Sequence, residues 1–335
     1  MNGGAAQVLQ GLRSAPGGRC SGQKLSADLG VTRTQIWKHV NTLREHGYQI
    51  EGEPGDGYRL AASPDRLYAE EVSAGLETNW LAREIEYLEE TDSTNRVASD
   101  RGREARAAGY TVIAERQTAG RGRLGRSFFS PPYRNLYTSV LLRPSLSTAD
   151  APTLIHAAAV GCANAIAMTL GDDRSVEIKW PNDILLDGLK TCGILMEMSS
   201  EATRLDFAVL GVGVNLNVDR ADFPDEFRAR ATSLRCHADR EVDRKAFTQQ
   251  LYYELERAFD AHASGGFEAV REAYEQRFRM FGRKVRVEDL DGSTHEGRVE
   301  GVATNGALIL EPEGGPTEHV LAGDVTVVKG ERLND

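Results

Sequence analysis

The spacing of hydrophobic residues changes twice along the chain. Up to residue 62, apolar positions recur at helical intervals and are followed by two short β-type runs. From residue 84, β-type runs alternate with helical stretches, and near the C-terminus only short β-type runs and turns remain. This pattern predicts an α+β protein of several domains with a linker at 61–68. The predicted domains are residues 1–62, 63–279 and 280–335.

The first domain is predicted to be a winged helix-turn-helix. Residues 21–46 form two helices around a Gly-containing turn, because Ile36, Val40 and Leu43 place one apolar stripe on the second helix. Two short strands then flank the turn Pro54-Gly55-Asp56-Gly57. The polar face of the second helix offers candidate DNA contacts, namely Arg33, Thr34 and Lys38. A helical domain that docks onto another protein is the alternative.

The second and third domains are predicted to differ in architecture. The central domain reads as a mixed sheet whose strands lie at 85–88, 111–115, 136–142, 176–186 (interrupted by Pro181), 190–198 and 207–217. Its helices are expected at 95–108, 151–170 and 247–278. Turns such as Asp291-Gly292 and Asn305-Gly306 separate five short C-terminal strands, which predict a small SH3-like β-barrel. These strands are expected at 284–287, 296–302, 307–310, 318–321 and 325–328.

The segment Gly120–Arg126 contains three glycines and three arginines. Glycine lets backbone N–H groups approach an anion, and arginine offers a fork that matches phosphate or carboxylate. The segment also fits the dinucleotide pattern G-x-G-x-x-G, but Pro131 and Pro132 oppose the long helix that this pattern requires, and Ser145 stands where its acidic residue belongs. We therefore predict a mobile loop that orders around a negative ligand; a merely solvated basic loop is the alternative.

Composition narrows the functional classes. The overall charge is −10, yet residues 1–62 hold seven basic and five acidic residues, which gives that domain +2 and the remainder −12. So few basic residues predict modest DNA affinity, and hence a dimer on two half-sites. The four cysteines and seven histidines show no metal-ligand spacing, and no signal peptide is expected. Residues 151–170 read as a buried helix rather than a membrane span, so a cytoplasmic protein without a protein-held metal is predicted.

Five motifs occur together and in order in the central domain. They are Glu90-Thr-Asp-Ser-Thr-Asn95, Gln117-Thr-Ala-Gly-Arg-Gly-Arg123, Lys179-Trp-Pro-Asn-Asp183, Lys190-x-x-Gly-Ile-Leu195 and Gly211-Val-Gly-Val-Asn215. Each motif alone is weakly specific, but the combination closely resembles the biotin protein ligases. With a winged helix in front, the chain resembles the bifunctional type that also represses biotin genes.

The resemblance implies a two-step reaction. Biotin and ATP form biotinyl-5′-AMP with the help of Mg²⁺, and a lysine of a biotin carboxyl carrier domain then takes the biotinyl group. The implied biotin ligands are Ser93, Thr94, Asn95, Gln117, Arg121, Gly122, Arg123 and Lys190. The implied ATP or adenylate ligands are Arg121, Arg123, Lys179, Asn182, Asp183 and Asn215. The implied catalytic residues are Lys190, Arg123 and Asp183.

The sequence also departs from the family pattern. Phe128 stands where some relatives have a tryptophan, and residues 319–324 lack the tryptophan that some relatives place against adenine. The resemblance further implies operator DNA as a partner and a homodimer formed when the adenylate binds. Two alternatives are a lipoate or other acyl–protein ligase and a biotin-sensing DNA-binding regulator without ligase activity.

Overall fold

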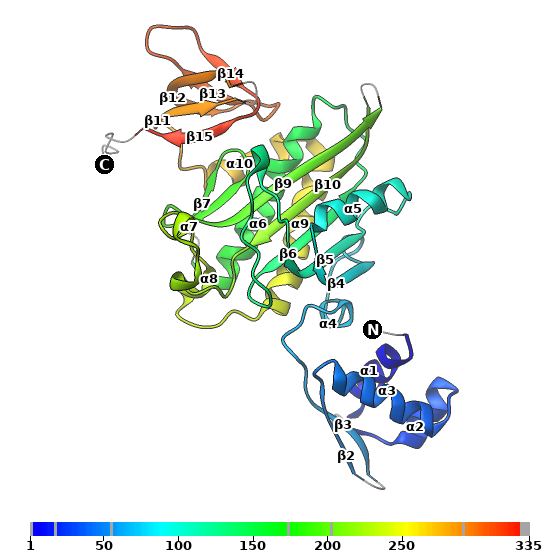
Figure 1. Ribbon diagram of the computed structural model, residues 1–335. Coiled ribbons are helices and arrows are strands. Elements are labelled where there is room, and N and C mark those ends of the chain that lie inside the picture. The colour runs from blue at the N-terminus through cyan, green and yellow to red at the C-terminus, as the bar shows by residue number, and fades with distance from the viewer. Residues whose placement is uncertain are drawn as a thin grey trace. The chain divides into compact units, whose positions relative to one another are not determined.

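The computed structural model describes residues 3–16, 19–53, 56–172, 175–201, 204–289 and 292–328 (Figure 1). Pro54, Gly55 and Asp291 of the predicted turns lie outside these residues. The chain folds into two compact units, Met1–Glu71 and Val72–Asp335.

The N-terminal unit is built on a helix-turn-helix, as predicted. Helices α1 (Gly3–Ser14), α2 (Gly22–Leu29) and α3 (Arg33–Glu45) surround a core to which the predicted stripe of α3 contributes. Thr32 and Gln35 form a capping box that begins α3. Strands β1 (Arg19–Cys20), β2 (Gln49–Glu53) and β3 (Gly57–Ala62) form a small sheet in the order β1-β3-β2, and the β2–β3 hairpin is the wing. Helix α4 (Ala69–Ser73) follows.

The second unit contains a seven-stranded sheet. In spatial order its strands are β4 (Ile85–Thr91), β5 (Thr111–Gln117), β6 (Leu136–Leu142), β10 (Arg204–Val214), β9 (Leu189–Glu201), β8 (Asp183–Leu186) and β7 (Val176–Lys179). Only the β4–β5 pair is parallel among the pairs within these described strands. The predicted mixed sheet is therefore confirmed.

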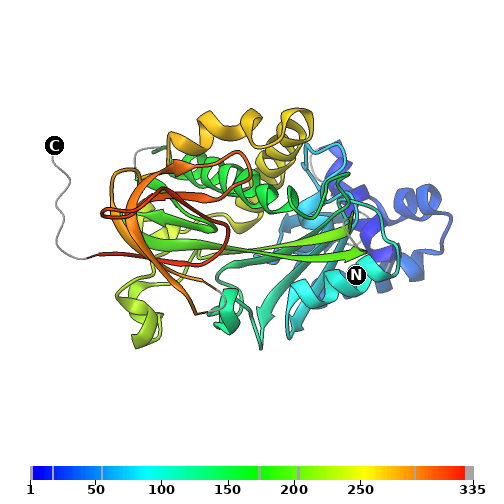
Figure 2. The same cartoon turned by 90° about the horizontal axis from the view of Figure 1, so that it is seen from above.

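Helices cover both faces of this sheet (Figure 2). Helix α5 (Thr94–Arg103) lies on one face, and α6 (Leu154–Leu170), α9 (Arg244–Gly265) and α10 (Glu268–Glu275) lie on the other. The side chains of β6 show this division, because Ser139 contacts α5 while the neighbouring Thr138 contacts Tyr252 of α9. The 151–170 stretch is long and apolar enough to cross a membrane, but most of it is buried inside the fold, as expected.

Two details of the helical layer were not predicted. The single helix expected at 247–278 is wrong, because the chain breaks at Gly266, which adopts φ 64°. The start of α9 also carries a buried charge. Arg244 donates to the Glu115 carboxylate on β5 at 2.7 Å, and both side chains are fully buried.

The C-terminal part of the second unit is an antiparallel five-stranded sheet in the order β14-β13-β12-β11-β15. The strands are β11 (Lys284–Glu288), β12 (Thr294–Val302), β13 (Leu308–Glu311), β14 (Glu318–Val320) and β15 (Asp324–Val327). The small antiparallel domain is confirmed. Among the described residues no pairing joins β14 to β15, so closure into an SH3-like barrel stays a prediction.

Candidate active site

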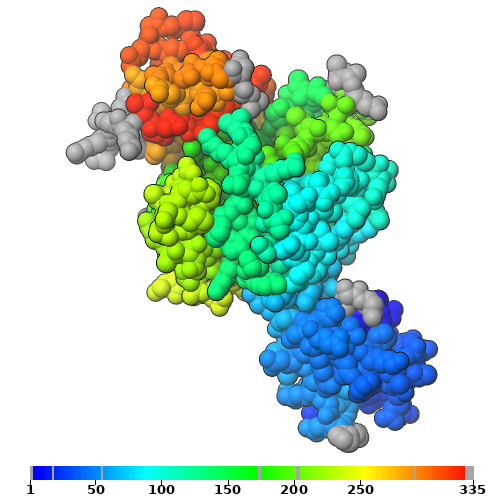
Figure 3. All heavy atoms as spheres, in the orientation of Figure 1, coloured from blue at the N-terminus to red at the C-terminus, as the bar shows by residue number. Residues whose placement is uncertain are grey.

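A cavity of about 730 Å³ opens on the sheet face that carries α5. It lies among the start of α5, the Gly120–Arg126 loop, the turn between β7 and β8, and the beginning of β15. In Figure 3 the teal segment that carries this loop crosses the face of the second unit between the cyan α5 region and the yellow-green α7–α8 region. All residues predicted for biotin or ATP line this one cavity, namely Ser93, Thr94, Asn95, Gln117, Arg121, Gly122, Arg123, Lys179, Asn182, Asp183, Lys190 and Asn215. Their individual roles stay predictions.

The first wall is the turn before α5. Ser93 is the N-cap residue, yet its side chain makes no capping hydrogen bond, so an ordinary N-cap role does not explain it. Gln117 Oε1 accepts hydrogen bonds from both the backbone N–H (2.9 Å) and the hydroxyl (3.1 Å) of Thr94. The Gln117 amide nitrogen donates to Ser130 at 3.3 Å. This wall therefore presents fixed hydroxyl and amide groups, which suit a neutral polar ligand.

Asn95 fills a notch in the floor of the cavity. A Cβ on Gly211 would lie 2.1 Å from Asn95 Oδ1, so only glycine leaves room for the Asn95 amide. Asn95 also donates to Glu197 at 2.8 Å, and Ser139 Oγ lies 2.6 Å from Asn95 Oδ1. Sequence reasoning missed Ser139 and Glu197, although Ser139 and its neighbour Thr138 stand out as polar residues in a mostly apolar strand.

The second wall carries the charged groups. Lys190 Nζ lies 2.6 Å from Asp183 Oδ1, which is buried and makes no hydrogen bond of normal geometry. Asn182 Nδ2 donates to the Ile194 carbonyl at 2.7 Å, and its Oδ1 accepts from Arg123 at 3.3 Å. Burial lowers the pKa of the Arg123 guanidinium, although the Asp183 carboxylate acts against that shift. The wall thus concentrates two cations and one carboxylate where an anionic ligand can reach them.

The Gly/Arg loop folds back on itself. Gly122 N–H donates to the Arg126 carbonyl at 2.7 Å, and Phe128 N–H donates to the Gly120 carbonyl at 2.9 Å. Leu124 adopts φ 56°, a left-handed conformation that is unusual for a leucine. These contacts give the loop a defined shape over the cavity.

Two glycines beneath this loop make room for an aromatic ring. A Cβ on Gly213 would lie 2.7 Å from Phe128 Cε1 and Cζ, and one on Gly193 would lie 3.2 Å from Phe128 Cε2. Glycines in a strand often mark the close approach of a ligand or of another backbone. In the structure, side chains from α5 and from the loop fill those positions.

The rim opposite α5 was not predicted. Phe223, Phe227 and Arg230 line the cavity around α7 (Asp225–Arg228), and the Arg230 guanidinium lies over the Phe227 ring at 5.4 Å. Their segment has no hydrophobic period from which a site could be recognised. Nearby Asn215 donates to the Thr232 carbonyl at 3.1 Å, so its amide also holds this rim in place.

The C-terminal domain lines the cavity through the start of β15, and it also contacts the turn between β7 and β8. Asp324 accepts a hydrogen bond from Arg126 at 2.6 Å, which links β15 to the Gly/Arg loop and raises the Arg126 pKa. The Gly306 carbonyl accepts from Trp180 Nε1 and lies within hydrogen-bond distance of His156 Nε2, both at 3.0 Å. Because Trp180 lies in the turn that carries Asn182 and Asp183, this contact ties the C-terminal domain to that turn.

The predicted DNA-binding residues share one surface of α3. Arg33, Thr34 and Lys38 are exposed, and the neighbouring Trp37 is 53% exposed. In the small sheet, by contrast, Arg59 of the wing pairs with Glu51, and Arg19 of β1 pairs with Asp56. Arg33 and Lys38 on α3 are therefore better placed to meet DNA than Arg59 and Arg19, whose charges are paired.

Comparison with known proteins identifies the class. The model of the biotin/lipoate A/B protein ligase family matches residues 87–215, a helix-turn-helix domain model matches residues 5–59, and the biotin protein ligase C-terminal domain model matches residues 280–328. The fold and the cavity thus define a ligase domain flanked by a helix-turn-helix and a C-terminal domain.

Individual relatives agree with this class. The chain is 36% identical over 295 residues to the bifunctional ligase/repressor BirA of Bacillus subtilis, covering 88% of this chain and 90% of that protein. It is 32% identical over 294 residues to the protein of the same name from Escherichia coli, covering 88% of each. Biotin protein ligase from Aquifex aeolicus in complex with biotin and ATP superposes with a TM-score of 0.63 at 25% identity, covering 74% of this chain and 100% of that one. The chain therefore belongs to the biotin protein ligase family, as its motifs had indicated.

Proposed function

We propose that this protein activates biotin with ATP to biotinyl-5′-AMP and transfers the biotinyl group to a lysine of a carrier protein. The observation that carries the proposal is the convergence of all predicted ligand-binding residues on one cavity. Its volume of about 730 Å³ lies in the range of small-molecule sites, roughly 300–1,000 Å³. The lipoate alternative is not favoured, since similar relatives are named biotin–[acetyl-CoA-carboxylase] ligases.

The two walls suit the two ends of the biotin molecule. We place the ureido ring of biotin against Ser93, Thr94 and Gln117, because a neutral ring needs donors and acceptors at fixed positions. The biotin carboxylate then lies toward Arg123 and Lys190. Its oxygen attacks the α-phosphorus of ATP, the bond to the bridging oxygen breaks, and pyrophosphate leaves. The two cations offset the negative charge that accumulates on the phosphorus oxygens.

Asp183 becomes available in the second step. In the structure its carboxylate faces Lys190. We propose that the adenylate phosphate draws Lys190 away and frees Asp183 to accept a proton from the incoming lysine. The lysine nitrogen then attacks the acyl carbon, the acyl–oxygen bond breaks, and AMP leaves.

The nucleotide is assigned to the rim. Phe223 and Phe227 offer aromatic surface to the adenine where the sequence lacks a C-terminal tryptophan, and Lys179, Asn182, Asn215 and Arg121 line the same cavity. Closure of the C-terminal sheet into an SH3-like barrel belongs to the same proposal and is supported by its five short antiparallel strands.

Mg²⁺ fits this site as a companion of ATP. Among the described residues no group of three or more His, Cys, Asp or Glu side chains could form a protein-only metal cage. Asp183 and Asp324 both line the cavity, and Mg²⁺ commonly binds through one or two carboxylates plus substrate phosphates. We propose that these two side chains face the metal, which would neutralise phosphate charge.

The N-terminal unit is proposed to bind operator DNA through Arg33, Thr34 and Lys38. A homodimer would supply two such units for two half-sites. The β9 edge supports a dimer, since β8 pairs with β9 only as far as Gly193. Asn182 and Asn95 bond to Ile194 and Leu195 just beyond, and among the described residues no strand pairs with this edge from Met196 onward. A cytoplasmic location would give this protein access to ATP, carrier and DNA.

A mass measurement tests the ligase. The protein is incubated with limiting biotin, Mg-ATP and a biotin carrier domain, and the carrier should gain one biotinyl group. We expect Lys190→Ala and Arg123→Gly to lose this activity at limiting biotin, whereas Lys24→Ala, an exposed lysine of the N-terminal unit, should retain it. An unmodified carrier with the wild-type protein would overturn the proposal.

A further inference from the structure

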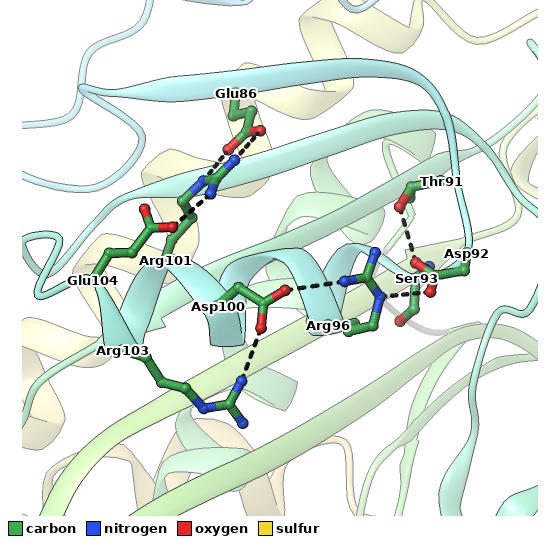
Figure 4. Close-up of polar contacts among 9 residues, drawn as sticks. All are labelled: Glu86, Thr91, Asp92, Ser93, Arg96, Asp100, Arg101, Arg103 and Glu104. Carbon is green, nitrogen blue, oxygen red and sulfur yellow. Dashed lines mark hydrogen bonds and ion pairs between the residues drawn. The ribbon is translucent and has the colours of Figure 1, made fainter.

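Asp92 stands just outside the cavity but contacts both segments that form its biotin wall. Its Oδ1 accepts hydrogen bonds from Thr91 Oγ1 at 3.1 Å and from the Ser93 N–H at 2.7 Å (Figure 4). A single oxygen of the Asp92 carboxylate therefore links Thr91 to Ser93, its two neighbours in the chain. This arrangement fixes the backbone of the turn from which Ser93 and Thr94 enter the cavity.

The other carboxylate oxygen holds Asp92 to α5. Oδ2 accepts from Arg96 Nε, and Arg96 also pairs with Asp100 at 3.0 Å. Asp100 in turn accepts from Arg103 at 2.8 Å, so a row of ion pairs follows the exposed side of α5 (Figure 4). Asp92 lies at the N-terminal end of this row, where the helix dipole favours a negative charge. The hydrogen bond from Arg96 lowers the Asp92 pKa to about 2, so the group is ionised throughout the neutral range.

The backbone at the same place anchors the Gly/Arg loop. The carbonyl of Thr91 accepts from Thr118 N–H at 2.9 Å, and the carbonyl of Asp92 accepts from Ala119 N–H at 3.0 Å. The loop departs directly after these residues. A shift of the Asp92 backbone would therefore move the Ser93–Thr94 turn and the origin of the loop together.

These contacts also explain the unusual state of Ser93. An N-cap serine ordinarily bonds its hydroxyl to the helix backbone. Here the turn is held by Asp92 instead, and Ser93 makes no side-chain capping bond. Its hydroxyl is thereby left for the cavity.

We propose that Asp92 is a positioning residue for biotin: it holds the Ser93–Thr94 turn and the base of the Gly/Arg loop in the geometry that biotin binding requires. This inference rests on the proposed ligase function. It assigns to Asp92 a larger effect on biotin than on ATP, because its carboxylate bonds to Thr91, Ser93 and Arg96, whereas only its backbone carbonyl reaches the Gly/Arg loop.

The chain offers a matched control. Asp92 and Asp100 both pair with Arg96 on the same exposed helix side, but only Asp92 bonds to the turn. We would compare Asp92→Ala, Asp92→Asn and Asp100→Ala in the full-length protein. Carrier biotinylation gives kcat and the KM for biotin and for ATP, calorimetry gives the Kd of biotin, and thermal denaturation checks folding.

Asp92→Ala is expected to raise the biotin KM and Kd about tenfold, since it removes a bridge of two hydrogen bonds. The ATP KM should change less than about twofold on the same argument. Asp92→Asn keeps an acceptor oxygen and should recover part of the loss, while Asp100→Ala should match wild type.

Two results would overturn the inference. One is an unchanged biotin KM and Kd in Asp92→Ala; the other is a parallel rise in both KM values, which would indicate a general structural effect. If Asp92→Ala does not fold, the same criteria apply to Asp92→Asn. A wild-type protein that binds no biotin and modifies no carrier would instead contradict the proposed function, so the two failures can be distinguished.

Discussion

Replacing Gly213 with alanine tests whether the Phe128 ring is confined over the cavity floor. The added Cβ would lie 2.7 Å from Phe128 Cε1 and Cζ, whereas nonbonded carbons rest at about 3.5–4.0 Å. The ring must therefore move by about 1 Å. Gly193 lies beneath another edge of the ring, and Tyr137 packs against it edge-on, so outward movement together with the loop is the available route.

Forcing one methyl group into such a tightly packed site destabilises the surrounding conformation by about 1–3 kcal/mol. If the substitution destabilises the loop conformation that binds biotin by this amount, the biotin Kd should rise about 5- to 150-fold. Titration calorimetry measures this Kd, and thermal denaturation shows whether the ligand-free protein is also destabilised. Pairing Gly213→Ala with Phe128→Leu should recover part of the affinity, because the smaller side chain leaves room for the methyl group.

Gly315→Ala is the control for this experiment. A Cβ there would make only ordinary contact with Pro312, at 3.5 Å, and neither residue lines the cavity. Both biotin affinity and melting temperature should match wild type. If Gly213→Ala also matches wild type in both measurements, Phe128 is not confined in the way described, and the argument is refuted.

Four further outcomes are expected. Glu115→Ala leaves the buried Arg244 guanidinium without its carboxylate and should lower the free energy of unfolding by about 3–5 kcal/mol in urea denaturation; a change below about 1 kcal/mol would contradict this. Burial lowers the pKa of His156 from 6.5 to about 4, so the unfolded state binds protons that the folded state does not. The free energy of unfolding should therefore fall as pH decreases from 6.5 to about 4. Melting temperatures measured across this pH range should depend less on pH in His156→Gln than in wild type. Asp183→Ala should slow transfer from preformed biotinyl-5′-AMP by about 10²-fold or more, and full-rate transfer would remove its proposed role. Lys38→Ala should weaken DNA binding. It should also reduce the slope of the logarithm of the DNA-binding constant against the logarithm of the salt concentration by about 1, whereas an unchanged slope would exclude a phosphate contact.

Individual helices and strands could be predicted from the sequence because their signals, such as periodicity, lie within a few neighbouring residues. The stripe on α3 follows from helical periodicity, and strand β6 was predicted at 136–142, where the structure places Leu136–Leu142. The break at Gly266 was missed because helical periodicity continues on both sides of it. A single glycine in a helical pattern does not by itself reveal its φ angle.

The motifs indicated the family and the residues of the candidate site, but they did not give its geometry. Nothing in the order of residues places Lys190 2.6 Å from Asp183, or Arg126 beside Asp324, which lies 198 positions later in the chain. The rim residues Phe227 and Arg230 carried no pattern at all. Such proximities are set by sheet order and by the packing of the C-terminal domain, and these are tertiary properties.

The sequence by itself determined most of the strands and long helices and which residues are suited to the chemistry, because periodicity, capping and residue type act within a few positions. Only the tertiary structure decided what the glycines of β10 accommodate. A Cβ at Gly211 or Gly213 would meet side chains that come from α5 and from the Gly/Arg loop. The physical reason is that close packing brings segments that are distant in sequence into van der Waals contact. The residue pattern of one strand does not show which side chains will pack against it.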